Sequence, residues 1–142
     1  TVSTRYIDQP QTLRWCLEMY LRLLRETYAP AVFSAFEDCE LAERQFGAAL
    51  SFHYNTGAIS DAAWVEEWKR GDCEAAHDSF MNWRKPPQII PRRTKERDLF
   101  FDGIWSSDGT VLEFAVEKPT YQVDPTSKKP VEVRFILEDL LS

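Results

Sequence analysis

The sequence predicts a mainly α-helical protein that ends in a small β-hairpin, and therefore an α+β fold overall. Up to about residue 105, apolar residues recur at steps of three and four, as they do on one face of an α-helix. After Gly103 the spacing changes, because residues 110–116 and 131–137 are rich in β-branched and aromatic side chains that partly alternate. We therefore expect a helical lobe over residues 1–105 and, packed on it, a β-hairpin extension over residues 106–142.

The first quarter of the chain predicts two helices that each begin at a proline. Pro10 and Pro30 suit a first helical position, where the missing N–H removes no hydrogen bond. The two helices are expected over residues 10–28 and 30–36. One face of the longer helix carries Leu13, Leu17, Tyr20, Leu21 and Leu24, and Arg14, Glu18, Arg22 and Arg25 largely occupy the other face.

A third helix is expected over residues 40–54, followed by a turn at Gly57. Glycine adopts the left-handed conformation with which many helices end, so Gly57 predicts the end of this helix. The apolar face of the helix consists of Leu41, Phe46, Ala49, Leu50 and Phe52.

Three shorter helices follow, and each has a start or stop signal. Ser60 or Asp61 can cap the first of them, because a side-chain oxygen there accepts from the free amides of the first turn, and Gly71 ends it. Asp72 caps the second, and Pro91 starts a third that runs through residue 101. The apolar residues of the first two are Ala62, Trp64, Val65, Trp68, Ala75, Ala76, Phe80 and Trp83.

The two strands are expected to be joined by a long loop and not by a tight hairpin turn. Residues 118–130 contain three prolines and two adjacent lysines. Proline cannot donate to a β-ladder, so this composition favours a loop.

The composition excludes several classes of protein. Five Trp, nine Phe and five Tyr among 142 residues, 44% of which are apolar, exclude a disordered tail and allow one buried core. No apolar run approaches the roughly 20 residues that span a bilayer. A formal net charge of −6 disfavours nucleic acid as a partner. Three cysteines and two histidines do not provide the ligand spacing of a zinc site, so neither a metal nor a cofactor is expected.

Four local signals occur in a fixed order between residues 48 and 101. They are the run Phe52-His53-Tyr54-Asn55-Thr56-Gly57, a helix that ends at Gly71-Asp72, a helix that ends at Trp83 before Lys85-Pro86-Pro87, and the run Arg92-Arg93-Thr94-Lys95-Glu96-Arg97. In this order they resemble the C-terminal helical lobe of phage-type lysozymes, the endolysins or muramidases that cleave peptidoglycan glycan strands. The resemblance covers about residues 10–105 and implies a lysozyme-like helical fold and a bacteriolytic function.

The resemblance implies that the turn after the aromatic run lines a sugar cleft. The substrate-binding residues would then be Tyr54, Asn55, Thr56 and Gly57, together with Trp83. A side-chain amide offers both a donor and an acceptor, which suits the N-acetyl group of an amino sugar. The alternative is that Asn55 and Thr56 only help to cap the helix, and the sequence leaves both interpretations open.

Two further sets of residues each have a functional and a structural interpretation. Trp64 and Trp68 share a helix face and could stack on sugar rings, although aromatic residues at this spacing belong to the core more often. The resemblance implies that Arg92 or Arg93 supports the catalytic carboxylate, whereas a run of charges is typical of a solvated face. Glu96 is at the helical spacing that allows it to pair with either arginine.

The resemblance does not identify a catalytic residue in this chain. The family carries its catalytic Glu in an N-terminal segment, and nothing in residues 1–9 resembles that segment. The other acids form runs that are typical of solvated faces, so the catalytic residue is unknown. The acids considered were Glu37, Asp38, Glu40, Glu43, Glu66 and Glu67.

The leading hypothesis is a lysozyme-like lobe that binds the glycan strand and is a complete glycoside hydrolase only if an upstream segment or a second chain supplies the acid. Position 1 is Thr and not Met, which leaves room for such a segment. The protein would be synthesised in the cytoplasm of a bacterial or phage-infected cell and would act at the cell wall once exported or released.

The alternative hypothesis is a degenerate lysozyme lobe that serves as a non-enzymatic protein-interaction module. In this case an exposed strand edge in residues 131–137 would recruit a protein partner by adding a strand. Under both hypotheses we expect neither nucleic acid as a partner nor a membrane span.

Overall fold

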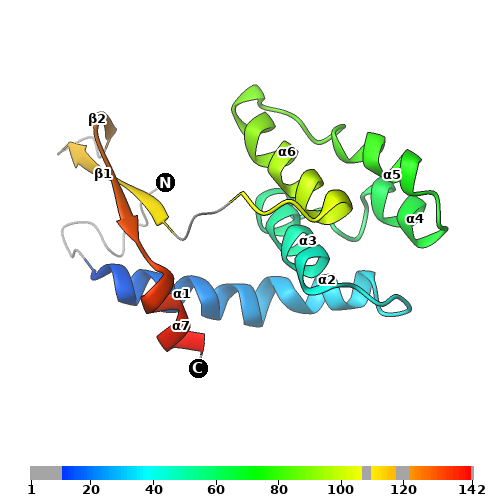
Figure 1. Ribbon diagram of the computed structural model, residues 1–142, viewed down its shortest axis with the longest axis horizontal. Helices are drawn as coiled ribbons and strands as arrows, with labels where there is room; N and C mark the ends of the chain where they lie inside the picture. The colour runs from blue at the N-terminus through cyan, green and yellow to red at the C-terminus, as the bar shows by residue number, and fades with distance from the viewer. Residues whose placement is uncertain (1–10, 107–109, 118–121, 142) are drawn as a thin grey trace. The chain divides into compact units, whose positions relative to one another are not determined.

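The computed structural model describes residues 11–106, 110–117 and 122–141 (Figure 1). These residues are mainly helical and include a two-stranded antiparallel sheet near the C-terminus, which confirms the predicted fold class. The chain divides into two compact units. The helical unit is Leu21–Ser106, and the terminal unit combines the described residues before Leu21 with those after Ser106. That the C-terminal extension packs on the helical lobe stays a prediction.

The first helical segments follow one another without a break. Helix α1 spans Leu13–Leu23, a π-helical turn spans Leu24–Tyr28, and α2 spans Ala29–Ala35. Pro30 lies in the first turn of α2, as the sequence predicts, whereas the expected start at Pro10 lies outside the described residues. No residue of α1 is buried, although the leucine pattern predicts an apolar face.

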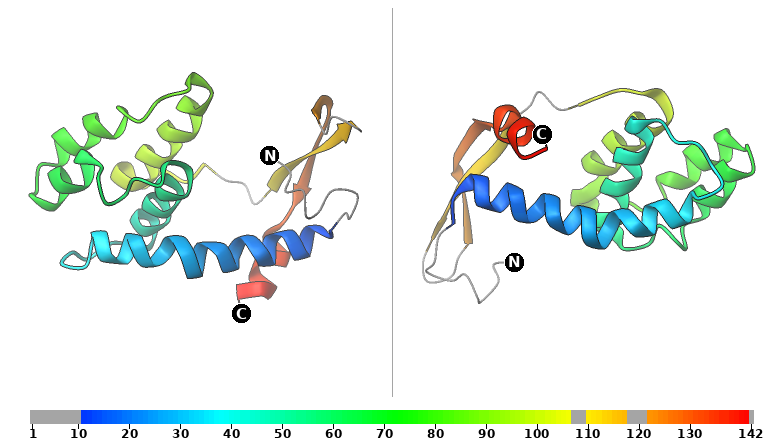
Figure 2. Two further views of the ribbon diagram at one scale, coloured as in Figure 1. Left: turned by 180° about the vertical axis from the view of Figure 1, so that it is seen from behind. Right: turned by 90° about the horizontal axis from the view of Figure 1, so that it is seen from below.

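The helical unit continues with four more α-helices, which Figure 2 shows from two further sides. They are α3 (Glu43–Thr56), α4 (Ala63–Lys69), α5 (Cys73–Phe80) and α6 (Ile90–Arg97), with a 3₁₀ turn at Pro87–Ile89 before α6 and a π-helical turn at Asp98–Asp102 after it. Helix α3 contacts α2, α6 and the turn after α6, whereas α4 and α5 pack chiefly against each other. Most of the predicted site residues lie on α3 or on α6, which contacts it.

The predicted signals at Gly57 and Asp72 are confirmed. Gly57 has a φ of 69°, and its amide donates to the carbonyl of His53 at 2.7 Å, so the left-handed glycine ends α3. The carboxylate of Asp72 accepts from the amide of Ala75 at 3.1 Å and caps α5. Both signals are local, since each depends only on residues within four positions.

The predicted cap of α4 is wrong. The helix begins after Ala62, which has no side-chain oxygen, and Ser60 and Asp61 lie in the turn that precedes it. Ala62 is only 2% exposed and belongs to the core. A buried alanine therefore occupies the cap position of α4, and no side-chain oxygen caps the helix.

The core of the helical unit is aromatic and centres on Trp64. The Trp64 ring is fully buried, and its centroid lies 5.3 Å from that of Phe52, 4.7 Å from that of Phe80 and 5.1 Å from that of Phe100. Trp68 is partly buried and packs against the same cluster. The structure thus supports the core interpretation of Trp64 and Trp68, because Trp64 is part of the buried aromatic cluster and Trp68 packs against it.

The C-terminal segment differs from the prediction in its second half. Strand β1 (Thr110–Glu117) forms where a strand was expected, but it pairs with β2 (Gln122–Glu132), which lies in the predicted loop. The predicted second strand is instead mostly α7 (Arg134–Leu141). Prolines are tolerated in β2 because each strand of a two-stranded sheet has an edge that needs no donor. The proposed docking edge at residues 131–137 is therefore wrong, since most of this segment is helical.

Candidate functional site

The last turn of α3 gives Thr56 and Asn55 different roles. The Thr56 hydroxyl donates to the carbonyl of Phe52 at 2.8 Å and accepts from the amide of Ala58 at 3.1 Å. Thr56 therefore closes the helix end, and its hydroxyl has no proton left to donate to a ligand. Asn55 is exposed, and its side-chain oxygen accepts a hydrogen bond from Arg93 on α6.

Arg93 lies at the centre of the polar network between α3 and α6. Its guanidinium is fully buried and donates to the carbonyl of Trp83 at 2.7 Å, to the side-chain oxygen of Asn55 and to the carboxylate of Glu96. The same group lies over the ring of Phe52, 5.0 Å from its centroid. One side chain thus connects α3, the segment after α5 and α6.

Glu96 holds both arginines of the predicted motif. Its carboxylate accepts from Arg93, from the Nε of Arg92 at 3.1 Å and from the hydroxyl of Ser51. Arg92 also donates to the carbonyl of Ser51 at 3.0 Å. Both ion pairs that the helical spacing allows are therefore present together within α6, and the hydrogen bonds of Glu96 and Arg92 with Ser51 fasten α6 to α3.

The burial of Arg93 and Glu96 contradicts the interpretation of this run as a solvated face. Glu96 is 4% exposed and Arg93 is not exposed at all. Burial lowers the pKa of Arg93, while the adjacent Glu96 carboxylate acts in the opposite direction by favouring the charged guanidinium. The carboxylate that Arg93 holds in this structure is thus on its own helix.

A hollow of about 350 Å³ opens beside this network, and we call it the Asn55 hollow. Its volume is within the range of small-ligand sites, about 300–1,000 Å³. The amides of Asn55 and Asn82 and the ammonium group of Lys85 supply polar groups, and Trp83 and Ile89 supply apolar surface. The complete lining consists of Asn55, Thr56, Asn82, Trp83, Lys85, Pro86, Ile89 and Arg93.

The structure brings together only part of the predicted site. Asn55, Thr56, Trp83 and Arg93 line one hollow, although they come from three different segments. Gly57 serves the backbone as a helix end and is not among the residues that line it.

Tyr54 and Arg92 belong to a neighbouring cluster. The Tyr54 ring packs edge-on against Tyr28, with centroids 5.1 Å apart, and the Arg92 guanidinium lies 5.8 Å from the Tyr54 centroid. Neither residue lines the Asn55 hollow. Tyr54 and Arg92 therefore contact each other outside the Asn55 hollow.

Two polar lining residues were missed by sequence reasoning, and one of them had a usable signal. Asn82 directly precedes Trp83, a predicted site residue, so the sequence allows its amide to be grouped with that of Asn55. In the sequence, Lys85 belongs to a proline-rich signal that ends a helix and gives no indication of a binding role. The sequence also gives no indication of which of the two adjacent arginines, Arg92 or Arg93, is buried.

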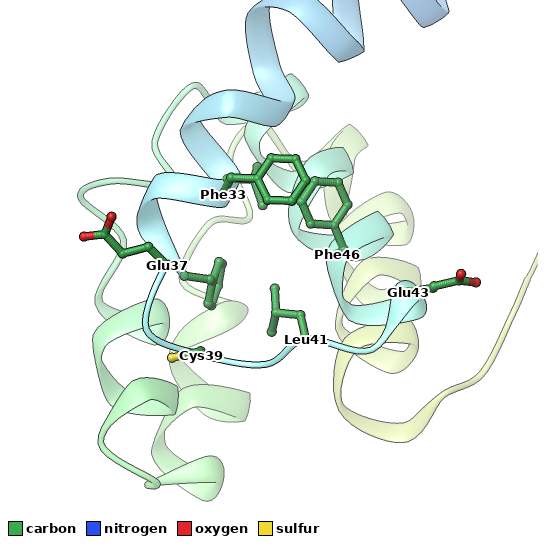
Figure 3. Close-up of a pocket in the computed structure, with 8 residues that line it drawn as sticks. Phe33, Glu37, Cys39, Leu41, Glu43 and Phe46 are labelled. Atoms are coloured by element: carbon green, nitrogen blue, oxygen red, sulfur yellow. The ribbon is translucent and has the colours of Figure 1, made fainter. Parts of the chain in front are cut away.

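The acids that were considered as catalytic candidates lie elsewhere in the described structure. Glu37 and Glu43 line a second hollow at the other end of α3, shown in Figure 3. Glu66 pairs with Lys69 at 3.8 Å. Among the described residues that line the Asn55 hollow there is no aspartate or glutamate. A catalytic acid is therefore not assigned.

The comparison with known protein families matches the phage lysozyme family over residues 5–96. Because the match covers more than half of the chain, the protein belongs to the phage lysozyme family, the peptidoglycan-directed endolysins and muramidases. The comparisons with curated proteins and with solved structures give no match. The family match includes α3, α6 and the whole lining of the Asn55 hollow.

Two further searches cover the described part of the chain. In that part, no helix combines the length and the apolar character needed to cross a bilayer. The same residues contain no group of three or more His, Cys, Asp or Glu side chains arranged to hold a metal ion.

Proposed function

We propose that the helical unit binds the glycan strand of peptidoglycan in the Asn55 hollow. The observation that carries this proposal is the hydrogen bond from Arg93 to the side-chain oxygen of Asn55. A guanidinium has donors and no acceptor, so the amide must direct its oxygen towards Arg93 and its two Nδ2 protons elsewhere. Those protons suit the carbonyl oxygen of an N-acetyl group, the substituent that both sugars of peptidoglycan share.

The other lining residues fit the same ligand. Asn82 offers a second amide, whose oxygen can accept from an N-acetyl N–H. The half-buried Trp83 offers apolar surface to a sugar ring. Lys85 is exposed at the edge of the hollow, where its ammonium group can attract the lactyl carboxylate of N-acetylmuramic acid. Together these groups favour an acidic, N-acetylated glycan over a neutral hexose polymer.

We also propose that the described residues do not supply the acid for cleavage. Glycosidases of this type use a pair of carboxyl groups that flank the scissile bond. No carboxylate lines the Asn55 hollow in the described part of the chain, and the buried Glu96 has its oxygens engaged by Ser51, Arg92 and Arg93. Hydrolysis between N-acetylmuramic acid and N-acetylglucosamine would then need an acid from an upstream segment or a second chain.

The proposed place of action follows from the ligand. The protein would be made in the cytoplasm of a bacterial or phage-infected cell and would meet the glycan strand at the cell wall after export or release. Its acidic net charge of −6 makes a purely electrostatic attachment to the wall unfavourable, so recognition would depend on the hollow.

The test is a titration of the ¹⁵N-labelled chain with chitotetraose, a soluble oligomer of N-acetylglucosamine. We expect chemical-shift changes at the side-chain amides of Asn55 and Asn82 and at the indole N–H of Trp83. Digestion of purified Gram-negative peptidoglycan by the same chain should release no muropeptides. Absence of shift changes at millimolar oligosaccharide would overturn the binding proposal, and release of muramic-acid-ended fragments would overturn the proposal of an incomplete site.

A second candidate function is a retired lobe that binds a protein and no glycan. The observation in its favour is the ion pair between Arg93 and Glu96, which neutralises within the chain the arginine that the family resemblance assigns to a catalytic carboxylate. A retired lobe would show no oligosaccharide-dependent change at Asn55 while retaining a stable fold. The chitotetraose titration therefore also decides between the two candidates.

A further inference from the structure

A second hollow, of about 380 Å³, lies between the end of α2, the loop that follows it and the start of α3. We call it the Phe33 hollow, and Figure 3 shows its side chains. It shares no lining residue with the Asn55 hollow and lies within the helical unit. Its lining consists of Val32, Phe33, Phe36, Glu37, Cys39, Leu41, Glu43 and Phe46.

The inner surface of this hollow is apolar and its rim is unusually exposed. Val32 and Phe36 form the floor and belong to the buried core. Phe33 is 64% exposed, although its ring packs against Phe46 with centroids 4.6 Å apart. A large aromatic side chain exposed at the edge of an apolar hollow is typical of a surface that a partner covers.

The rim of the hollow is acidic. In Figure 3 the carboxylates of Glu37 and Glu43 point outward on opposite sides of the hollow, and both residues are exposed. Asp38 and Glu40 lie in the same loop and are also exposed. Residues 31–43 include four acids and no lysine or arginine, so this segment adds four negative charges without a counter-charge within it.

These four acids have no ion-pair partner among the described residues. The nearest arginine in the sequence, Arg44, directs its guanidinium to the carbonyls of Leu99 and Phe100, at 3.1 and 2.9 Å. The rim therefore keeps an uncompensated negative potential around an apolar centre.

We propose that the Phe33 hollow docks a segment of a partner protein in which a bulky apolar side chain is flanked by lysine or arginine. The apolar side chain would cover Phe33 and Phe46, and the flanking cations would pair with Glu37 and Glu43. Charge excludes several other occupants: an anionic lipid surface, a nucleic acid and the acidic glycan strand would all be repelled. A second copy of this chain also carries a net charge of −6 and is disfavoured for the same reason.

The test uses the full chain and the blocked peptide acetyl-Lys-Lys-Leu-Phe-Lys-Lys-amide as the probe. A ¹⁵N titration should shift the backbone amides of Phe33, Leu41 and Phe46. Addition of the peptide should also slow the alkylation of Cys39, which lines the hollow, and leave the exposed Cys16 and Cys73 unaffected. A peptide with glutamates in place of the lysines, and one with Ser-Gly in place of Leu-Phe, should each bind far more weakly.

Variants test where the peptide binds, and they separate the apolar contribution to binding from the contribution of charge. Phe33→Ala should weaken peptide binding at least about fivefold, as truncation of an interface aromatic does. Trp105→Ala is the matched control, because Trp105 is 65% exposed in the same unit and lies outside the hollow. Glu43→Gln should weaken binding about two- to fivefold and reduce its salt dependence. Glu74→Gln, which also removes a carboxylate from the first turn of a helix, should change neither the binding nor its salt dependence.

Three results would overturn the proposal. Equal binding of the lysine-flanked and glutamate-flanked peptides would remove the argument from charge. Full binding by Phe33→Ala, in a variant whose urea denaturation shows that it is folded, would place the peptide elsewhere. Concentration-dependent dimerisation of the chain that disappears in Phe33→Ala would assign the hollow to a second copy and not to a basic partner.

Discussion

Arg93 donates a hydrogen bond to the side-chain oxygen of Asn55, and this bond determines which way the Asn55 amide faces. The arginine is itself held by Glu96 and by the carbonyl of Trp83, so its position does not depend on a ligand. The buried ion pair between Arg93 and Glu96 thus orients the Asn55 amide, which a glycan would meet, before any ligand binds. Preorganisation of this kind lowers the entropy lost on binding.

The first prediction separates the two ends of the Asn55 amide. Asn55→Asp keeps the oxygen that accepts from Arg93 and removes the two Nδ2 protons that we propose bind the sugar. We expect the free energy of unfolding to stay the same or rise slightly, because the bond becomes charge-assisted, while chitotetraose affinity falls about tenfold. Urea denaturation measures the first quantity and an NMR titration the second. Unchanged affinity would mean that the amide protons do not contact the sugar.

The second prediction concerns the buried carboxylate. Glu96→Gln should lower the free energy of unfolding by about 3 kcal/mol, because Arg93 is fully buried and would lose the charge that compensates it. Glu74→Gln, an exposed change of the same type on α5, should alter it by less than about 0.5 kcal/mol. Both values come from urea denaturation. A loss of less than about 1 kcal/mol for Glu96→Gln would show that Arg93 reaches water in solution.

A double substitution tests whether the loss comes from the orphaned charge. Replacement of Arg93 and Glu96 together by apolar residues of similar length, Arg93→Met with Glu96→Leu, removes both charges at once. We expect the double variant to be less destabilised than the sum of the two single variants, because no buried charge is left unpaired. Strict additivity would contradict a direct interaction between the two side chains.

The end of α3 and the start of α5 could be predicted because they have strong local signals, whereas the start of α4 does not. Gly57 and Asp72 need only their nearest neighbours in sequence to end α3 and begin α5. The prediction is wrong at the C-terminus, where the sequence analysis expects a strand over residues 131–137 and the structure has α7 from Arg134. The buried and half-buried residues from Val133 onward are in fact Val133, Ile136, Leu137 and Leu140, which have the three- and four-residue spacing of a helix.

The candidate site could be predicted only in part for a different reason. Sequence similarity pointed to Asn55, Trp83 and the arginine pair, but a run of charged residues gives no indication of burial. Arg93 is buried because it lies on the side of α6 that packs against Phe52, whereas Arg92 next to it remains half-exposed. Such a difference between adjacent residues is decided by tertiary packing, which no local pattern contains.

The third prediction compares two glycines of the same region. Gly57 has a φ of 69°, so Gly57→Ala should destabilise the protein by about 1 kcal/mol through backbone strain, although an added Cβ would meet nothing within 4 Å. Gly47 lies inside α3 and its added Cβ also meets nothing within 4 Å. Gly47→Ala should therefore stabilise the protein by about 0.5–1 kcal/mol. Changes of the same sign in thermal unfolding would contradict the assigned conformations.

His53 carries a pH dependence that the structure explains. Burial lowers the pKa of His53 below its ordinary value of about 6.5. The Nδ1 atom of the ring accepts from the amide of the fully buried Ile59 at 3.3 Å, and the ring packs edge-on against Tyr28. An imidazolium can only donate, so protonation removes the bond to Ile59 and places a charge in a half-buried position.

The fourth prediction follows from this difference between the folded and unfolded states. Between the lowered pKa of the folded state and the ordinary pKa of the unfolded chain, the unfolded chain binds more protons, so stability rises with pH. The contribution of neutral His53 is complete above about pH 7.5 and declines as the pH falls through about 6.5 to the pKa of the folded state. His53→Gln keeps an acceptor for Ile59 but does not titrate, so urea denaturation at about pH 7.5 and about pH 5 should show a smaller loss for the variant than for the wild type. The same comparison with His77→Gln measures how much of the pH dependence comes from the other histidine. An equal loss of unfolding free energy in the wild type and in His53→Gln would contradict the prediction.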